Sequence, residues 1–295
     1  MANGAAPRIG LALGAGGARG WAHIGVIRAL AEAGVKPDIV CGTSIGALVG
    51  GAHASGEIDR LERWVGSLGW RDVLGLVDIG WRGGFIRGEK LFDFFRSRVV
   101  DRDISALGMP FGAVATEIDP GREVWLREGS VMDAVRASIV IPGVFAPVMR
   151  DGRLLVDGGL VNPVPVSLCR ALGADIVIAV VLGLAKLGYF RDRARTRAAQ
   201  GAGDDQRWWS RWLPPKAEEA GDSMPSALNV FMSSMDVMQV RIGRSRLAGE
   251  PADLLITPVL PDMRSLEFHR AAEAMAEGRA ATVRMRPILE HLLGA

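Results

Sequence analysis

Two strand–turn–helix units at the start of the chain constrain its fold most strongly. In the first, an apolar run over 9–13 ends at glycines and precedes helical spacing over 21–33. In the second, the short run 39–41 is followed by a small-residue helix over 45–55. Strands joined by crossover helices must run parallel. We therefore expect an α/β fold, a three-layer sandwich in which helices cover both faces of a mainly parallel sheet.

Weaker patterns extend this alternation along the rest of the chain. Apolar runs predict further strands over 111–116, 123–126, 154–156 and 176–182, with a turn over 119–121. Helical spacing predicts helices over 58–66, 88–98, 131–137, 166–171 and 268–293.

Charge and cysteine content exclude several classes of protein. Lys and Arg number 35 against 33 Asp and Glu, so no basic surface for nucleic acid is expected. Cys41 and Cys169 lie in apolar runs and predict buried free thiols, not a disulfide scaffold or a Cys-rich zinc site. No signal-peptide pattern and no run of about 18 uncharged apolar residues is found. We expect a cytoplasmic protein without a metal site.

A polar segment over 188–221 interrupts the apolar pattern. It is rich in arginine and contains Trp208, Trp209 and Trp212. This composition is typical of a mobile surface loop or a cap on the core. It also suits peripheral contact with a membrane, where indole rings lie at the depth of the headgroups. Both interpretations stay open.

Glycines dominate the turn after the first strand, from Gly14 to Gly20, in the order Gly-Ala-Gly-Gly-Ala-Arg-Gly. Such a loop before a helix can direct backbone N–H groups at a phosphate or a developing oxyanion. An ordinary strand-to-helix turn would also use glycine.

The second turn reads Gly42-Thr-Ser44-Ile-Gly46. It matches Gly-x-Ser-x-Gly in the strand–turn–helix context of a nucleophile elbow. A third motif, Asp157-Gly158-Gly159, follows the strand 154–156, although an Asp–Gly turn alone would look the same. Together the motifs offer a nucleophile, a base and oxyanion donors.

In this order the three motifs resemble those of the patatin-like phospholipases. Segments 20–25 and 137–147 also resemble that family, and the resemblance covers about 8–182, nearest the bacterial branch related to neuropathy target esterase. It implies three parts: a catalytic core over 8–182, the insertion over 188–221, and a C-terminal helical part over 222–295 packed on the core.

The resemblance also implies a Ser–Asp dyad. Ser44 would be the nucleophile and Asp157 its base. The oxyanion hole would use Gly16 and Gly17, with Ala15 or Ala18. The implied supporting residues are Gly14, Arg19, Gly20, Gly42, Gly46, Gly158 and Gly159, with Arg19 holding the loop in shape. Ala15 departs from the family's triple glycine, and its methyl group requires a negative φ.

The implied activity is a serine acyl hydrolase that cleaves lipid esters without a cofactor. Acyl transfer to an alcohol would use the same chemistry. A regulator that kept the fold and lost activity is an alternative.

Two other interpretations use different residues. A triad hydrolase would place His269 after Ser44 and Asp157, but His269 lies at the start of a predicted helix. A dinucleotide-binding oxidoreductase would use Gly14, Gly16 and Gly20, with Asp38 as the acid that binds the ribose. Asp38 precedes the second strand, whereas a ribose-binding acid would lie at its end. This position weakens the oxidoreductase interpretation.

Overall fold

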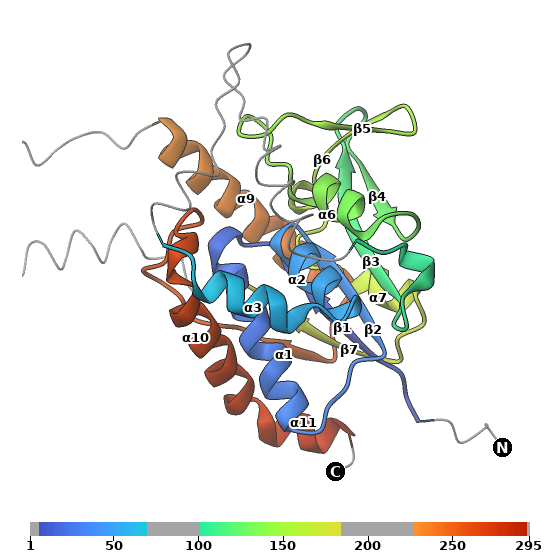
Figure 1. Cartoon of the computed structure of the whole chain (residues 1–295), viewed down its shortest axis with the longest axis vertical. Coiled ribbons are helices and arrows are strands. Elements are labelled where there is room, and N and C mark those ends of the chain that lie inside the picture. The colour runs from blue at the N-terminus through green and yellow to red at the C-terminus, as the bar shows by residue number, and fades with distance from the viewer. Residues whose placement is uncertain (1–5, 70–100, 184–226, 294–295) are drawn as a thin grey trace, which may run out of the picture.

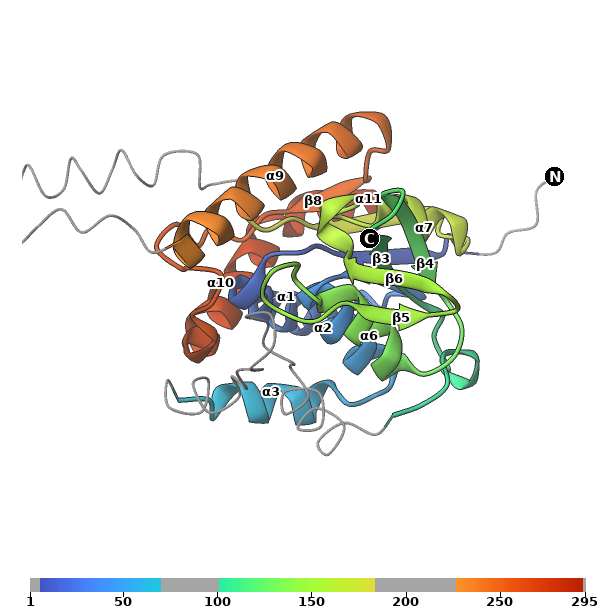
Figure 2. The same cartoon turned by 90° about the horizontal axis from the view of Figure 1, so that it is seen from above.

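The computed structural model describes residues 6–69, 101–183 and 227–293. They form one mixed sheet with helices on both faces (Figures 1 and 2). Its order is β5-β6-β3-β2-β1-β7-β8, and β4 also pairs with β3. The strands are β1 (Ile9–Leu13), β2 (Ile39–Thr43), β3 (Phe111–Glu117), β4 (Arg122–Leu126), β5 (Val148–Arg150), β6 (Arg153–Asp157), β7 (Ile176–Val180) and β8 (Leu254–Ile256).

The helices form two layers (Figure 2). One layer holds α1 (Ala22–Glu32), α2 (Ile45–Ala54), α3 (Ile58–Gly66), α6 (Val131–Ile139), α10 (Ala271–Arg284) and α11 (Arg286–Leu293). The other holds α7 (Val166–Ala171) and α9 (Ala227–Gly249). Short 3-10 helices cover Gly17–Trp21, Ile104–Ala106, Gly158–Leu160 and Phe268–Arg270.

Alternation of side chains along the strands divides the core between these layers. In β1, Leu11 and Leu13 pack in the cluster formed with α1 and α2, whereas Ala12 packs in the cluster formed with α7. The free thiols of Cys41 and Cys169 are buried in that second cluster. A strand that is apolar on both faces is typical of a parallel sheet covered by two helical layers.

Strands β2 and β6 lie end to end along one edge of β3. β2 is parallel to β3, and its last residue, Thr43, pairs with Val114. β6 is antiparallel to β3, and its last residue, Asp157, pairs with the next residue, Ala115. Because β4 pairs with both Val114 and Ala115, it occupies the opposite edge. The two strand ends therefore meet, and the residues just after β2 face those at the end of β6.

The mainly parallel α/β fold is confirmed, because β1, β2, β3, β7 and β8 pair in parallel. The strand predicted over 154–156 is present as β6, but it runs antiparallel to β3. The single helix predicted over 268–293 was also wrong: it is divided at Met285, and Pro287 has no N–H with which to continue α10. Strand β8 was not predicted, so the part after residue 222 is not purely helical.

Two predicted segments, the helix over 88–98 and the insertion over 188–221 with Trp208, Trp209 and Trp212, lie outside the described residues. In the three described ranges, no helix combines the length and the apolar character needed to cross a membrane.

Candidate active site

Ser44 occupies a strained turn between β2 and α2. Its φ of 57° and ψ of −125° lie outside the regions that side chains with a Cβ prefer. Glycine is required on both sides of it. A Cβ on Gly42 would lie 2.3 Å from the carbonyl oxygen of Gly46, and one on Gly46 would lie 2.1 Å from that of Leu13. Such strain at a functional side chain is typical of a nucleophile elbow.

Asp157 is hydrogen-bonded directly to Ser44. The Ser44 hydroxyl donates to Asp157 Oδ2 at 2.5 Å, and the Gly159 N–H donates to Asp157 Oδ1 at 2.7 Å. The carboxyl group is fully buried. Burial raises its pKa to about 6, although both hydrogen bonds act to lower it. The group is thus a stronger base than an ordinary aspartate, yet largely ionised at neutral pH.

Ser138 on α6 links the serine turn to the sheet. The Ser44 N–H donates to Ser138 Oγ at 2.9 Å, and that hydroxyl donates to the Val114 carbonyl oxygen at 2.6 Å. Thr116 adds a second link, because its hydroxyl donates to the Asp157 carbonyl oxygen at 2.8 Å. The sequence predicted no role for Ser138 or Thr116. Ser138 lies in the family-like segment 137–147, and that was its only signal.

Only part of the glycine loop has backbone donors to offer a ligand. The N–H of Ala15 donates to the Pro163 carbonyl oxygen and that of Ala18 to the Ser265 carbonyl oxygen, both at 2.8 Å. Neither N–H is therefore directed at a substrate. Among the described residues, no acceptor is found for the N–H of Gly16 or Gly17.

The backbone conformation of the glycine loop explains why alanine is tolerated at position 15 and glycine is needed at position 17. The described non-glycine residues with positive φ are Ser44 and Asp151, so Ala15 has the negative φ that its methyl group needs. Gly17 has a φ of +57°, and a Cβ there would lie 2.4 Å from the Ser265 carbonyl oxygen.

Arg19 holds the loop from inside the protein. Only 3% of its surface is exposed. Its Nε donates to the Gly16 carbonyl oxygen at 3.0 Å, and its Nη2 contacts Asp236 at 2.6 Å and Ser265 Oγ at 3.0 Å. Ser265 Oγ in turn lies 2.9 Å from both oxygens of Asp236. Asp236 and Ser265 had no signal in the sequence, because each lies more than 200 positions from Arg19 and belongs to no motif.

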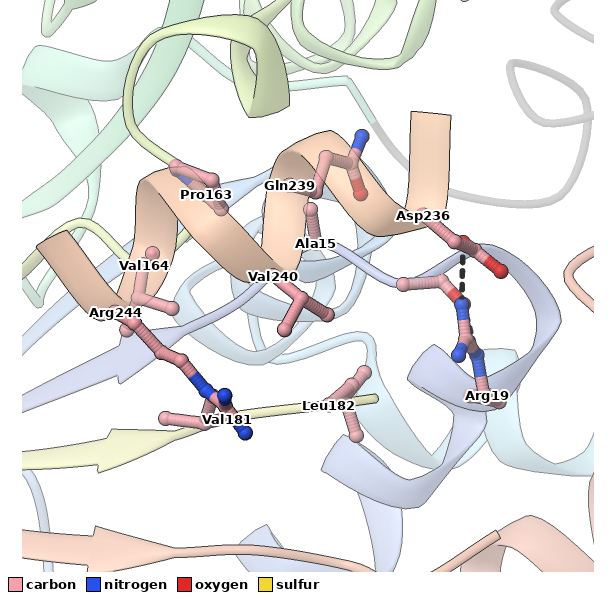
Figure 3. Close-up of a pocket in the computed structure, with 12 residues that line it drawn as sticks. Ala15, Arg19, Pro163, Val164, Val181, Leu182, Asp236, Gln239, Val240 and Arg244 are labelled. Atoms are coloured by element: carbon pink, nitrogen blue, oxygen red, sulfur yellow. Dashed lines mark hydrogen bonds and ion pairs between the residues drawn. The ribbon is translucent and has the colours of Figure 1, made fainter. Parts of the chain in front are cut away.

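A narrow cavity separates the glycine loop from α9. Ala15, Gly16 and Arg19 line one side, and Asp236, Gln239 and Arg244 line the other (Figure 3). Its volume of about 20 Å³ suits one water-sized molecule and excludes a lipid. The shared lining shows that α9 lies next to the glycine loop.

Histidine does not intervene between Ser44 and Asp157. His23 is fully buried with Nε2 2.8 Å from the Gly14 carbonyl oxygen, and burial lowers its pKa to about 4. His269 is exposed in the 3-10 helix before α10.

Asp38 does not lie where a dinucleotide would need it. Its carboxylate accepts the N–H of Ile9, at the start of β1, whereas the glycine loop follows the end of that strand. A ribose bound near the loop would be out of its reach. Within the ranges described, no group of three His, Cys, Asp or Glu side chains could hold a metal ion.

Several known proteins are similar to this chain. The sequence model of a family described as patatin-like phospholipase matches residues 11–170. The chain is 38% identical to an uncharacterised NTE family protein of Mycobacterium tuberculosis, over 93% of this chain and 90% of that protein. It is 31% identical to the lysophospholipase nte1 of Emericella nidulans, over 92% of this chain and 18% of that protein. The structure of VipD from Legionella pneumophila aligns with a TM-score of 0.49 and 15% identity, covering 96% of this chain and 67% of that chain.

Proposed function

Because this chain belongs to the patatin-like phospholipase family, we propose that it hydrolyses lipid acyl esters with a dyad of Ser44 and Asp157. The observation that carries the proposal is the direct 2.5 Å hydrogen bond from a serine at positive φ to a buried carboxylate. A serine hydroxyl is a weak nucleophile until a base accepts its proton, and Asp157 is the base in contact with it.

The first half of the reaction forms an acyl-enzyme. Asp157 accepts the hydroxyl proton while Ser44 Oγ attacks the ester carbonyl carbon. The carbonyl oxygen becomes an oxyanion, which the N–H groups of Gly16 and Gly17 stabilise. When the carbon–oxygen bond to the leaving alcohol breaks, Asp157 returns its proton to that alcohol.

The second half releases the fatty acid. Water attacks the acyl carbon, and Asp157 accepts a proton from the water. The second tetrahedral intermediate collapses, Ser44 Oγ leaves, and Asp157 protonates it. A general base works best when its pKa lies near the working pH, and the raised pKa of Asp157 suits this role. If an alcohol replaces water, the same steps transfer the acyl group.

The substrate class and location follow as parts of the proposal. One relative is named a lysophospholipase, so lysophospholipids are the first substrates to test. A cytoplasmic location is supported by the two buried free thiols.

Labelling with a fluorophosphonate probe tests the dyad. Wild-type protein, Ser44→Ala and Asp157→Asn are treated alike, and the labelled peptide is mapped. The proposal expects label on Ser44, none in Ser44→Ala and strongly slowed labelling in Asp157→Asn. Folded wild-type protein that stays unlabelled, also with lipid vesicles present, would favour the regulator. Label at full rate in Asp157→Asn would assign the base elsewhere.

A further inference from the structure

Helix α9 has an inner face that borders the candidate active site. Asp236 contacts Arg19, which holds the glycine loop. One turn later, Gln239 packs against the Asp157 turn: a Cβ on Gly159 would lie 2.5 Å from Gln239 Nε2 and 2.8 Å from Asp157 Oδ1. Whatever binds the other face of α9 is therefore held close to the dyad.

The outer face of α9 is apolar in its first half and basic in its second. Val230, Phe231, Val237 and Met238 are 36–55% exposed. Arg241 follows on the same face, and Arg244 follows at its edge, where it also borders the cavity; both are exposed. In Figure 2, α9 lies along the border of the molecule, on the side of the sheet opposite α1 and α2.

In the part of the chain that the structure describes, no acid balances these two arginines. Asp236 is the one acidic residue within α9, and its carboxylate is turned to Arg19. Within the described ranges, no carboxylate lies at ion-pair distance from Arg241 or Arg244. The exposed apolar group on β4 to β6 differs in this respect: Trp125, Met149 and Leu154 lie among Glu128 and Asp151 as well as arginines.

We propose that the outer face of α9 docks the enzyme on a lipid bilayer that contains anionic phospholipid. Exposed apolar side chains of a helix enter the boundary between headgroups and acyl chains, and arginines on it attract the phosphates. The unbalanced positive charge favours this occupant over an apolar protein surface. The inference rests on the proposed function, since a lipid substrate would then lie in the surface to which α9 binds, beside the glycine loop and Asp157.

Vesicle flotation of the Ser44→Ala protein tests docking without turnover. The vesicles contain phosphatidylcholine alone, or phosphatidylcholine with phosphatidylglycerol. We expect binding to the anionic vesicles, reduced at least about tenfold by Arg241→Gln with Arg244→Gln, because each arginine near an anionic surface contributes about fivefold. Phe231→Ser with Met238→Ser should weaken binding to both vesicle types.

The matched control removes exposed apolar side chains elsewhere. Val283 and Ile288 are 59% and 51% exposed on α10 and α11, which reach the opposite end of the molecule (Figure 1). Val283→Ser with Ile288→Ser should float as the parent does. The unfolding temperature of every variant is measured, so that loss of fold is not taken for loss of docking.

Three outcomes overturn the inference: no binding to anionic vesicles, equal binding by the α9 variants and their parent, or a dimer that the α9 variants dissociate. Binding that needs α9, in a protein whose wild type is never labelled by fluorophosphonate, would support docking while the proposed function fails. The two proposals can therefore fail separately.

Discussion

Ser44 Oγ and Asp157 Oδ2 lie 2.5 Å apart although 113 positions separate them in the chain. The meeting of β2 and β6 on one edge of β3 brings them together, since Thr43 and Asp157 pair with consecutive residues of β3. The same contact places a carboxylate in the interior, where its charge is costly. Catalytic use and stability therefore make opposite demands on Asp157.

Asp157→Asn should abolish most activity and stabilise the fold. Asparagine keeps the shape and can still accept the Gly159 N–H, but it cannot accept the proton of Ser44. Turnover should fall by about 10²–10⁴-fold. Because burial raises the folded-state pKa from 3.8 to about 6, ionisation of Asp157 weakens the fold as pH rises between these two values, and the loss stays constant at higher pH. At pH 8 the variant should be more stable by up to about 3 kcal/mol, the equivalent of two pKa units.

Urea unfolding at pH 8 and at pH 4 checks this prediction. Near pH 4 most of the gain should disappear, because the wild-type carboxyl group is then protonated in the folded state. A variant less stable than wild type at pH 8 would contradict it.

The rate of ester hydrolysis should fall below pH 6. The base must be ionised to accept the Ser44 proton, so kcat/KM should drop about tenfold per pH unit on the acid side of the Asp157 pKa. A soluble ester avoids changes in a vesicle surface. Because a histidine base would give a similar acid limb, His269→Asn is the control. If the acid limb of the kcat/KM profile shifts or disappears in His269→Asn, the base is His269 and not Asp157.

The parts of the fold that could be predicted depend on local patterns. Apolar runs ended by glycine indicate β1, β2 and their crossover helices, and the motif order indicates Ser44 and Asp157. The direction of β6 could not be predicted, because a run of five residues, Arg153–Asp157, does not reveal the direction of a strand. β8 has three residues, Leu254–Ile256, too short a run to show a period.

Contacts between isolated polar residues were equally hidden. Ser138 and Asp236 lie on the helices α6 and α9, and no spacing in the sequence connects them with a partner. Their roles depend on which strand or loop the helix packs against. The use of the Ala15 and Ala18 N–H groups was missed for the same reason, since their acceptors, Pro163 and Ser265, are remote in the chain.

Ser138→Ala should reduce both stability and kcat. The change leaves the Ser44 N–H and the Val114 carbonyl oxygen without their partner in a buried site. We expect a loss of about 1–3 kcal/mol in the free energy of unfolding, and a lower kcat with little change in KM, because the position of Ser44 is loosened. Ser55→Ala is the matched control: the Ser55 hydroxyl is buried without a hydrogen-bond partner, so its loss should cost little. Equal effects of the two variants would contradict the prediction.

Gly17→Ala should inactivate the enzyme, whereas Gly34→Ala should not. Both glycines have positive φ, so each substitution costs about 1–2 kcal/mol in backbone strain. At Gly34 nothing lies within 4 Å of the new Cβ, while at Gly17 it would meet the Ser265 carbonyl oxygen at 2.4 Å and displace the loop. Melting temperature and turnover of both variants separate the two effects. If Gly17→Ala retains full turnover, the loop does not supply the oxyanion donors.

Asp236→Asn should show how far α9 determines the geometry of the glycine loop. The change removes the charge that faces Arg19, whose side chain is 3% exposed and holds the Gly16 carbonyl oxygen. Breaking a buried ion pair by removing one partner costs about 3–5 kcal/mol, and a displaced loop should lower kcat more than it raises KM. Asp59→Asn is the control, because the Asp59 carboxylate, which pairs with Arg28, is 66% exposed, and surface pairs contribute about 0–1 kcal/mol. Denaturant unfolding with steady-state kinetics on a soluble ester measures both quantities. A stability loss without any change in kcat would mean that the Asp236 contact supports the fold but does not set the position of the oxyanion donors.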